Sequence, residues 1–179
     1  MATAFLARIR TTLINYIESM TIAGGYFYNY PSADERDPAK LTLTAANAAC
    51  WLNFGSGDDG QLEETSLDPE DHADGTAYHN TFPLFITSLA STALETGDPK
   101  ENYKVCCWQM LEDFKKALGT NINLTAKGVL FWNEIQNIEY VGAVINWKIH
   151  KDALTPGVLV SQFKITYAQL RSNPNTIAI

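Results

Sequence analysis

The chain has 179 residues, of which 46% are hydrophobic and 11% aromatic, and its formal net charge is -7. This length and composition suit one domain with a substantial core, and they exclude a disordered or fibrous chain. No apolar run reaches the roughly 20 residues of a membrane-spanning helix. We therefore expect a soluble protein, without a removed leader segment and without a membrane partner.

Apolar residues at three- and four-residue steps predict a first helix from about Phe5 to Met20. Gly24 and Gly25 supply the backbone freedom that a helix end commonly uses. The aromatic stretch Tyr26 to Tyr30, stopped by Pro31, predicts a strand that leaves the helix.

The middle of the chain combines short strand patterns with a long acidic segment. Strands are predicted at Leu41–Ala45, Cys50–Phe54 and Pro83–Thr87, and a Gly- and Asp-rich loop is predicted at about 55–81. No Lys or Arg occurs from Leu41 to Pro99, whereas this stretch holds ten of the 20 acidic residues. Such a segment repels phosphate, which argues against ordinary nucleic-acid binding through it.

A second helix is marked at both ends. Asp98 is a candidate N-cap, Pro99 suits the first helical position, and Gly119 suits the end. Lys115 and Lys116 lie near the negative end of the helix dipole. The apolar stripe of this helix comprises Tyr103, Cys107, Met110, Leu111, Phe114 and Leu118.

The last third of the chain is predicted to form strands. A short strand is predicted at Val129–Trp132, followed by two long strands at Ile138–Ile149 and Val158–Ala168 that pair as a hairpin. In the first long strand, strict alternation places on one face Val141, Ala143, Ile145, Trp147 and Ile149. Together these elements predict a single α+β domain over residues 1–179. It consists of a mainly antiparallel sheet, two helices packed on one face of the sheet, and a long acidic loop.

Recognised catalytic and cofactor motifs are missing from the sequence. Gly55 to Asp59 lacks the spacing of a nucleophile elbow, and neither a phosphate-binding glycine loop nor a Cys-x-x-Cys pair occurs. We expect no enzyme and no cofactor.

One loop gathers oxygen and imidazole donors, namely Asp68, Glu70, Asp71, His72, Asp74 and His79, but their spacing does not match a calcium loop. A solvated acidic loop is the favoured interpretation, and a metal- or ligand-binding module that uses residues 68–79 is the alternative.

The remaining reactive or aromatic side chains have structural interpretations. Cys106 and Cys107 are expected in the core, and the odd cysteine count fits a reducing interior. His150 is interpreted as a polar strand end. The four tryptophans are expected as core or interface anchors: Trp51, Trp108, Trp132 and Trp147.

Three stretches give the chain a family resemblance. They are the opening helix that runs into Gly24-Gly25-Tyr26, the helical segment from Leu111 to Gly119, and the closing segments Tyr140–Ile145 and Phe163–Tyr167. In type and order these elements resemble the tail terminator family of long-tailed bacteriophages. Neck and tail-completion proteins share much of this layout, so a head–tail joining protein is the alternative within virions.

The resemblance implies a virion structural protein of the tail and neck region, made in the host cytoplasm. It implies a hexameric ring that stops polymerisation of the tail tube protein and joins the tail to the head connector, with DNA passing through the lumen without sequence-specific binding. No catalytic residue is implied.

Two sets of residues are candidates for the contacts of such a ring. Strand edges and aromatic side chains suit subunit contacts, and the candidates are Tyr26, Tyr28, Tyr30 and Trp147. The acidic residues are expected to line the lumen or a docking face, and these candidates are Asp58, Asp59, Glu63, Glu64, Asp68, Glu70, Asp71 and Asp74.

Overall fold

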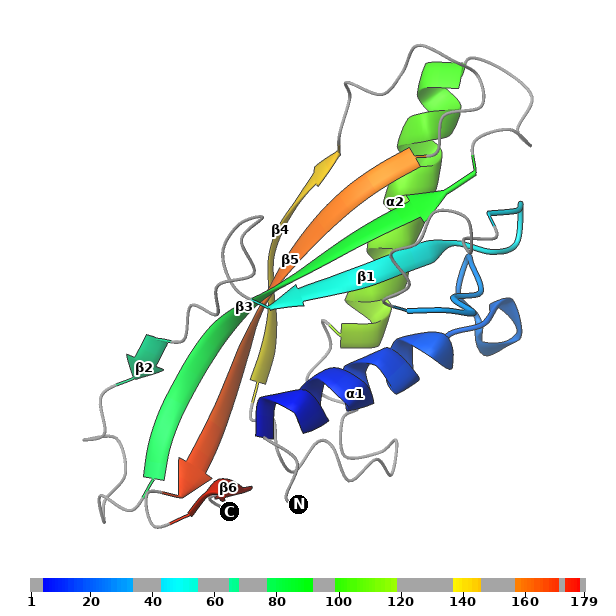
Figure 1. The fold of residues 1–179 in the computed structure, drawn as a ribbon. Helices are drawn as coiled ribbons and strands as arrows, with labels where there is room; N and C mark the ends of the chain where they lie inside the picture. The colour runs from blue at the N-terminus through cyan, green and yellow to red at the C-terminus, as the bar shows by residue number, and fades with distance from the viewer. Residues whose placement is uncertain are drawn as a thin grey trace.

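The computed structural model describes residues 5–33, 43–54, 65–67, 77–91, 99–118, 137–145, 157–170 and 173–177. Two helices lie against a twisted sheet (Figure 1). The helices are α1 (Phe5–Glu18) and α2 (Pro99–Leu118), and a short 3-10 turn, η1 (Ile22–Gly24), follows α1. Both helices form where the apolar spacing predicts them. Pro99 is the first residue of α2, and Lys115 and Lys116 lie in its last turn, as expected.

Within the described residues, the sheet contains six antiparallel strands. They are β1 (Ala49–Phe54), β2 (Thr65–Leu67), β3 (Ala77–Ala90), β4 (Asn137–Ile145), β5 (Gly157–Leu170) and β6 (Asn173–Ile177). The order along the sheet is β1-β3-β5-β4, with β2 paired to β3 and β6 paired to β5. The α+β prediction and the pairing of the two closing strands are thereby confirmed.

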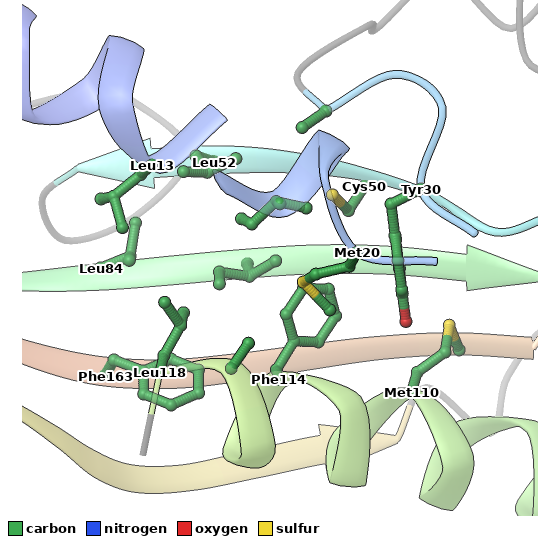
Figure 2. Close-up of a cluster of buried hydrophobic side chains, with 14 of the residues drawn as sticks. Leu13, Met20, Tyr30, Cys50, Leu52, Leu84, Met110, Phe114, Leu118 and Phe163 are labelled. Atoms are coloured by element: carbon green, nitrogen blue, oxygen red, sulfur yellow. The ribbon is translucent and has the colours of Figure 1, made fainter. Parts of the chain in front are cut away.

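Both helices cover the same face of the sheet. Cross-strand partners such as Leu84 and Phe163 belong to this face, and they are fully buried in one cluster with Leu13 of α1 and Phe114 of α2. Figure 2 shows these side chains meeting between the helices and the strands. The predicted apolar stripes explain this arrangement, because each helix buries its stripe on the alternate residues of β1, β3 and β5.

The predicted strand Tyr26–Tyr30 is wrong. Only an isolated bridge between Asn29 and Asn47 occurs there, because the amides of Phe27 and Tyr28 donate to the Asp113 carboxylate instead of joining a strand ladder. The described part of the predicted strand Leu41–Ala45 is not a strand either. The Thr44 hydroxyl accepts hydrogen bonds from the amides of Ala46 and Asn47, which makes a local turn.

The predicted loop at 55–81 is too long. β2 lies inside it, and β3 begins at Ala77 and continues for 14 residues, all paired with β5. Long-range pairing therefore makes a strand of polar residues whose local pattern predicts a loop. Pro83 lies within β3 between the residues that pair with β2 and those that pair with β1, so the N–H that proline lacks is not required by either partner.

The strict alternation predicted for the first closing strand is also wrong. A bulge in β4 between Tyr140 and Gly142 shifts the register against β5. β6 was not anticipated, and its register against β5 is irregular. The predicted strand Val129–Trp132 and the residues Trp147, Ile149 and His150 lie outside the described residues.

Candidate assembly surface at the β4 edge

Among the described strands, β4 is the last on one side of the sheet (Figure 1). It pairs with β5, and no described strand pairs with its other edge from Glu139 to Ile145. Other outer strands of the described sheet carry features that discourage strand addition. Ala33 bridges to Cys50 of β1, β2 has only three residues, and β6 contains Pro174. In the described part of the chain, the β4 edge carries none of these features and has backbone donors and acceptors without a strand partner.

Two exposed valines border this edge on the sheet face without helices. Gly142 and Val144 pair with Gln162 and Val160 of β5, which lie on that face. The bulge turns Val141 to the same face, where it lines a hollow with Pro83, Gln162 and Lys164. Val141 is 54% and Val144 68% exposed. A Cβ at Gly142 would meet no atom within 4 Å, so a notch separates the two valines.

Trp108 lies on the stripe of α2 that contains Lys115, because it lies seven residues before Lys115. The Lys115 ammonium is 4.8 Å from the centre of the Tyr140 ring in β4, which shows that this stripe faces β4. Trp108 is 53% exposed. We call the open edge of Glu139–Ile145, together with Trp108, Val141 and Val144, the β4 surface.

The charges around the β4 surface are balanced. Lys115 lies on its helix side and Lys164 on the opposite face, where it pairs in register with Glu139. Glu112 is 3.9 Å from Lys115, in a largely exposed pair that contributes little in water. Large apolar side chains beside an open strand edge, without an excess of either charge, are typical of protein contact surfaces.

The opposite side of α2 holds the segment from Gly25 to Tyr30 in place. The Asp113 carboxylate accepts hydrogen bonds from the amides of Phe27 (2.8 Å) and Tyr28 (3.1 Å) and from the hydroxyl of Tyr30 (3.2 Å). One turn further, the Lys116 ammonium donates to the Gly25 carbonyl at 2.6 Å. These contacts join segments more than 80 positions apart, and they fix how the end of α1 meets α2.

Burial governs the ionisation of this network. It raises the pKa of the Asp113 carboxyl, although the accepted hydrogen bonds and the charge of Lys116 act in the opposite direction. The pKa of the Tyr30 hydroxyl is raised well above its ordinary value, chiefly by burial and then by the charge of Asp113. Asp113 is thus a structural residue in the interior.

The four aromatic candidates for subunit contact differ in where the structure places them. Tyr28 and Tyr30 are 4% and 0% exposed, so their rings have no free surface to offer a neighbour. Tyr26 packs partly against the core, and the Lys116 ammonium lies 4.6 Å from its ring centre. Trp147 lies outside the described residues.

The acidic candidates and most of the suspected metal ligands lie outside the described residues. This holds for Asp58, Asp59, Glu63, Glu64, Asp68, Glu70, Asp71, His72 and Asp74. Of the suspected ligands only His79 belongs to a described strand, β3. Among the described residues, no three side chains of the metal-binding types gather.

The cysteines lie in the core, as expected. Cys50, Cys106 and Cys107 are free thiols with at most 1% exposure. The Cys107 thiol lies 3.7 Å from the Val158 carbonyl, and burial raises its pKa to about 12. Burial likewise raises the pKa of Cys50.

Sequence reasoning missed the β4 surface, apart from Trp108 as a possible anchor. It placed Val141 on the inner face because it assumed unbroken alternation. The glycine at position 142 was the available signal, since an isolated glycine within a strand often marks a bulge.

The fold and this surface define a helix-on-sheet α+β protein with an apolar, accessible strand edge. A comparison with known proteins adds no family: no family model matches the chain, and no curated protein has a significantly similar sequence. Within the described ranges, neither helix has the length and apolar character needed to cross a membrane.

Proposed function

We propose that this chain is a structural protein of a bacteriophage virion, a tail terminator whose copies form a hexameric ring. The ring caps the tail tube, stops its polymerisation and joins the tail to the head connector, while DNA passes through the lumen. The three resembling stretches of sequence support the family, and the α+β fold is compatible with it.

The observation that carries an assembly role is the β4 surface. A ring subunit needs surfaces that persist on the folded monomer and become buried only on assembly. Val141, Val144 and Trp108 are three of the five large hydrophobic residues found exposed in the described part of the chain; the two valines lie on β4, whose outer edge pairs with no described strand, and Trp108 lies on the stripe of α2 that contains Lys115. Burying such side chains is favourable, at roughly 25 cal/mol per Å² of apolar area.

Native mass spectrometry tests the proposal directly. The purified chain is measured alone and with the tail tube protein encoded in the same genome, and tube lengths are measured by electron microscopy. We expect a ring-sized species that binds tube ends and shortens the tubes. A chain that neither forms a ring nor binds the tube ends contradicts the proposal.

A connector experiment separates the terminator from a neck or tail-completion protein. The same chain is mixed with the head connector protein and with the tube protein in parallel. Binding to both supports the terminator. A ring that binds the connector and not the tube supports the neck protein instead.

A further inference from the structure

We propose that Trp108 of one copy of this chain inserts into the hollow beside β4 of the next copy. The hollow is lined by Thr81, Phe82, Pro83, Val141, Gln162 and Lys164. This contact rests on the proposed function, because it is the contact between neighbouring subunits of the ring. Its two halves are different surfaces of the same chain.

The size of the hollow suits an aromatic side chain. Its volume is about 250 Å³, whereas a cavity of about 150 Å³ already holds a benzene molecule. The two fused rings of an indole therefore fit. Trp108 is 53% exposed, so its ring is available to a neighbour without a change in the fold.

The chemistry of the lining suits an indole in particular. Pro83 and Val141 offer apolar contact. The side-chain carbonyl of Gln162 can accept a hydrogen bond from the indole N–H. The ammonium of the exposed Lys164 can lie over the face of the indole, where a cation is attracted. Aromatic residues seated in such pockets supply much of the affinity of protein contacts.

Charge favours Trp108 over Phe27, the other large aromatic residue found exposed in the described ranges. Glu112 lies one helical turn after Trp108 and is 65% exposed, so its carboxylate can meet Lys164 of the next copy. Phe27 instead follows a segment that contacts the Lys116 ammonium. A second cation beside Lys164 is unfavourable.

The same charges fix the direction in which α2 crosses the hollow. Lys104 lies one turn before Trp108, and Glu112 lies one turn after it. In one direction Glu112 meets Lys164 and attracts it. In the reverse direction Lys104 meets Lys164 and repels it, so only the first direction is favourable.

The symmetry of the contact follows from its two different halves. Trp108 belongs to a helix that covers one face of the sheet, whereas the hollow lies on the face without helices. A surface that paired with itself would close a dimer and stop. Here every pair keeps one free indole and one free hollow, so association continues until a ring closes.

Sedimentation velocity of the full chain tests the indole half of the contact. Trp108→Ala removes the inserted ring at an exposed position, so the fold should tolerate it. Phe27→Ala is the matched control, because Phe27 is 52% exposed and keeps its backbone amide bond to Asp113. We expect Trp108→Ala to weaken self-association at least about tenfold and Phe27→Ala to leave it unchanged. Equal association of wild type and Trp108→Ala, or a wild-type chain that stays monomeric, overturns the proposal.

A second variant alters the hollow. Val141→Asp places a charge in its lining at a side chain that is already 54% exposed. Ile22→Asp is the control, because Ile22 is a 46% exposed aliphatic residue of η1, away from β4. We expect Val141→Asp to weaken self-association at least about tenfold and Ile22→Asp to leave it unchanged. Wild-type association of Val141→Asp contradicts the contact.

Exchanging the charges tests the direction of the contact. Glu112→Lys and Lys164→Glu each bring like charges together, so each should weaken self-association at least about threefold. The double variant restores an opposite pair and should regain wild-type association. A double variant that associates no more tightly than either single variant contradicts the placement of Trp108 in the hollow.

Mixing two variants shows whether the halves are complementary. Val141→Asp retains the indole, and Trp108→Ala retains the hollow, so together they make one productive contact. We expect a one-to-one heterodimer and no ring. If neither variant binds the other, head-to-tail association is wrong.

The tube experiment separates the contact from the proposed function. If the chain associates through this contact and does not bind tail tubes, the phage function fails and the contact stands. If Trp108→Ala and Val141→Asp still form rings that cap tubes, the function stands and the contact fails.

Discussion

Replacing Asp113 should destabilise the protein strongly. The carboxylate is 1% exposed and accepts three hydrogen bonds, two from backbone amides and one from the Tyr30 hydroxyl. Each buried donor left without a partner costs about 1–3 kcal/mol. Removing a charge whose burial is unfavourable offsets part of this, so we take the lower end, about 3 kcal/mol for Asp113→Ala.

Urea denaturation followed by circular dichroism measures this loss, and thermal melting gives a second reading. For a chain of this size, a loss of about 3 kcal/mol corresponds to a fall of about 6–12 °C in Tm. Glu112→Ala is the neighbouring control, because its exposed pair with Lys115 contributes less than about 1 kcal/mol. If Asp113→Ala loses less than about 1 kcal/mol, the network does not hold the Gly25–Tyr30 segment as described.

The pH dependence of the same site has a defined sign. The folded-state pKa of Asp113 is raised, so between the ordinary carboxyl value of about 3.9 and the raised value the folded state binds more protons than the unfolded state. The stability that this group contributes is present below that window and is lost as the pH rises through the folded pKa. The stability of wild type relative to Asp113→Asn should therefore increase as the pH falls through the window. A relative stability that decreases on acidification would show that hydrogen bonding outweighs burial.

Three further outcomes are expected. Gly25→Ala should lower the free energy of unfolding by about 1 kcal/mol, because Gly25 has a φ of 84° and an added Cβ would lie 2.9 Å from the Lys116 ammonium. Gly142→Ala should be neutral or slightly stabilising, because an added Cβ there meets no atom within 4 Å. Urea denaturation that ranks the two variants the other way refutes this. Ser161→Ala should raise the free energy of unfolding by about 1 kcal/mol, because the Ser161 hydroxyl is buried without a hydrogen-bond partner, and an unchanged or lower value would show that it has one. The three buried cysteine thiols should react with a thiol reagent at pH 8 only after unfolding, because they are inaccessible and burial raises the pKa of Cys50 and Cys107. Rapid labelling of the native protein contradicts their placement in the core.

Local patterns predicted the elements whose residues form repeating contacts with the core. The spacing of Ile9, Leu13 and Ile17 identified the buried face of α1, and the alternation of Phe163, Ile165 and Tyr167 identified that of β5. These residues are spaced at the helical or strand period, so sequence is sufficient to place them.

Tertiary structure decided the features whose hydrogen-bond partners lie far along the chain. Tyr28 and Tyr30 donate hydrogen bonds to Asp113, which lies more than 80 residues away in the chain. No local sequence pattern predicts this partner. The polar start of β3 is a strand because it pairs with β5. The local sequence does not show which distant strand will pair with these residues, so their low strand propensity predicted a loop.

The sequence by itself determined the α+β class, the two amphipathic helices and the pairing of the closing strands, because a repeating pattern of apolar residues specifies which face is buried. Only the tertiary structure decided that Val141 turns outward at a bulge, that Trp108 stays exposed on α2, and that β4 is the last of the described strands on its side of the sheet. The reason is physical: burial follows a local period, whereas an edge exists only relative to the strands that surround it.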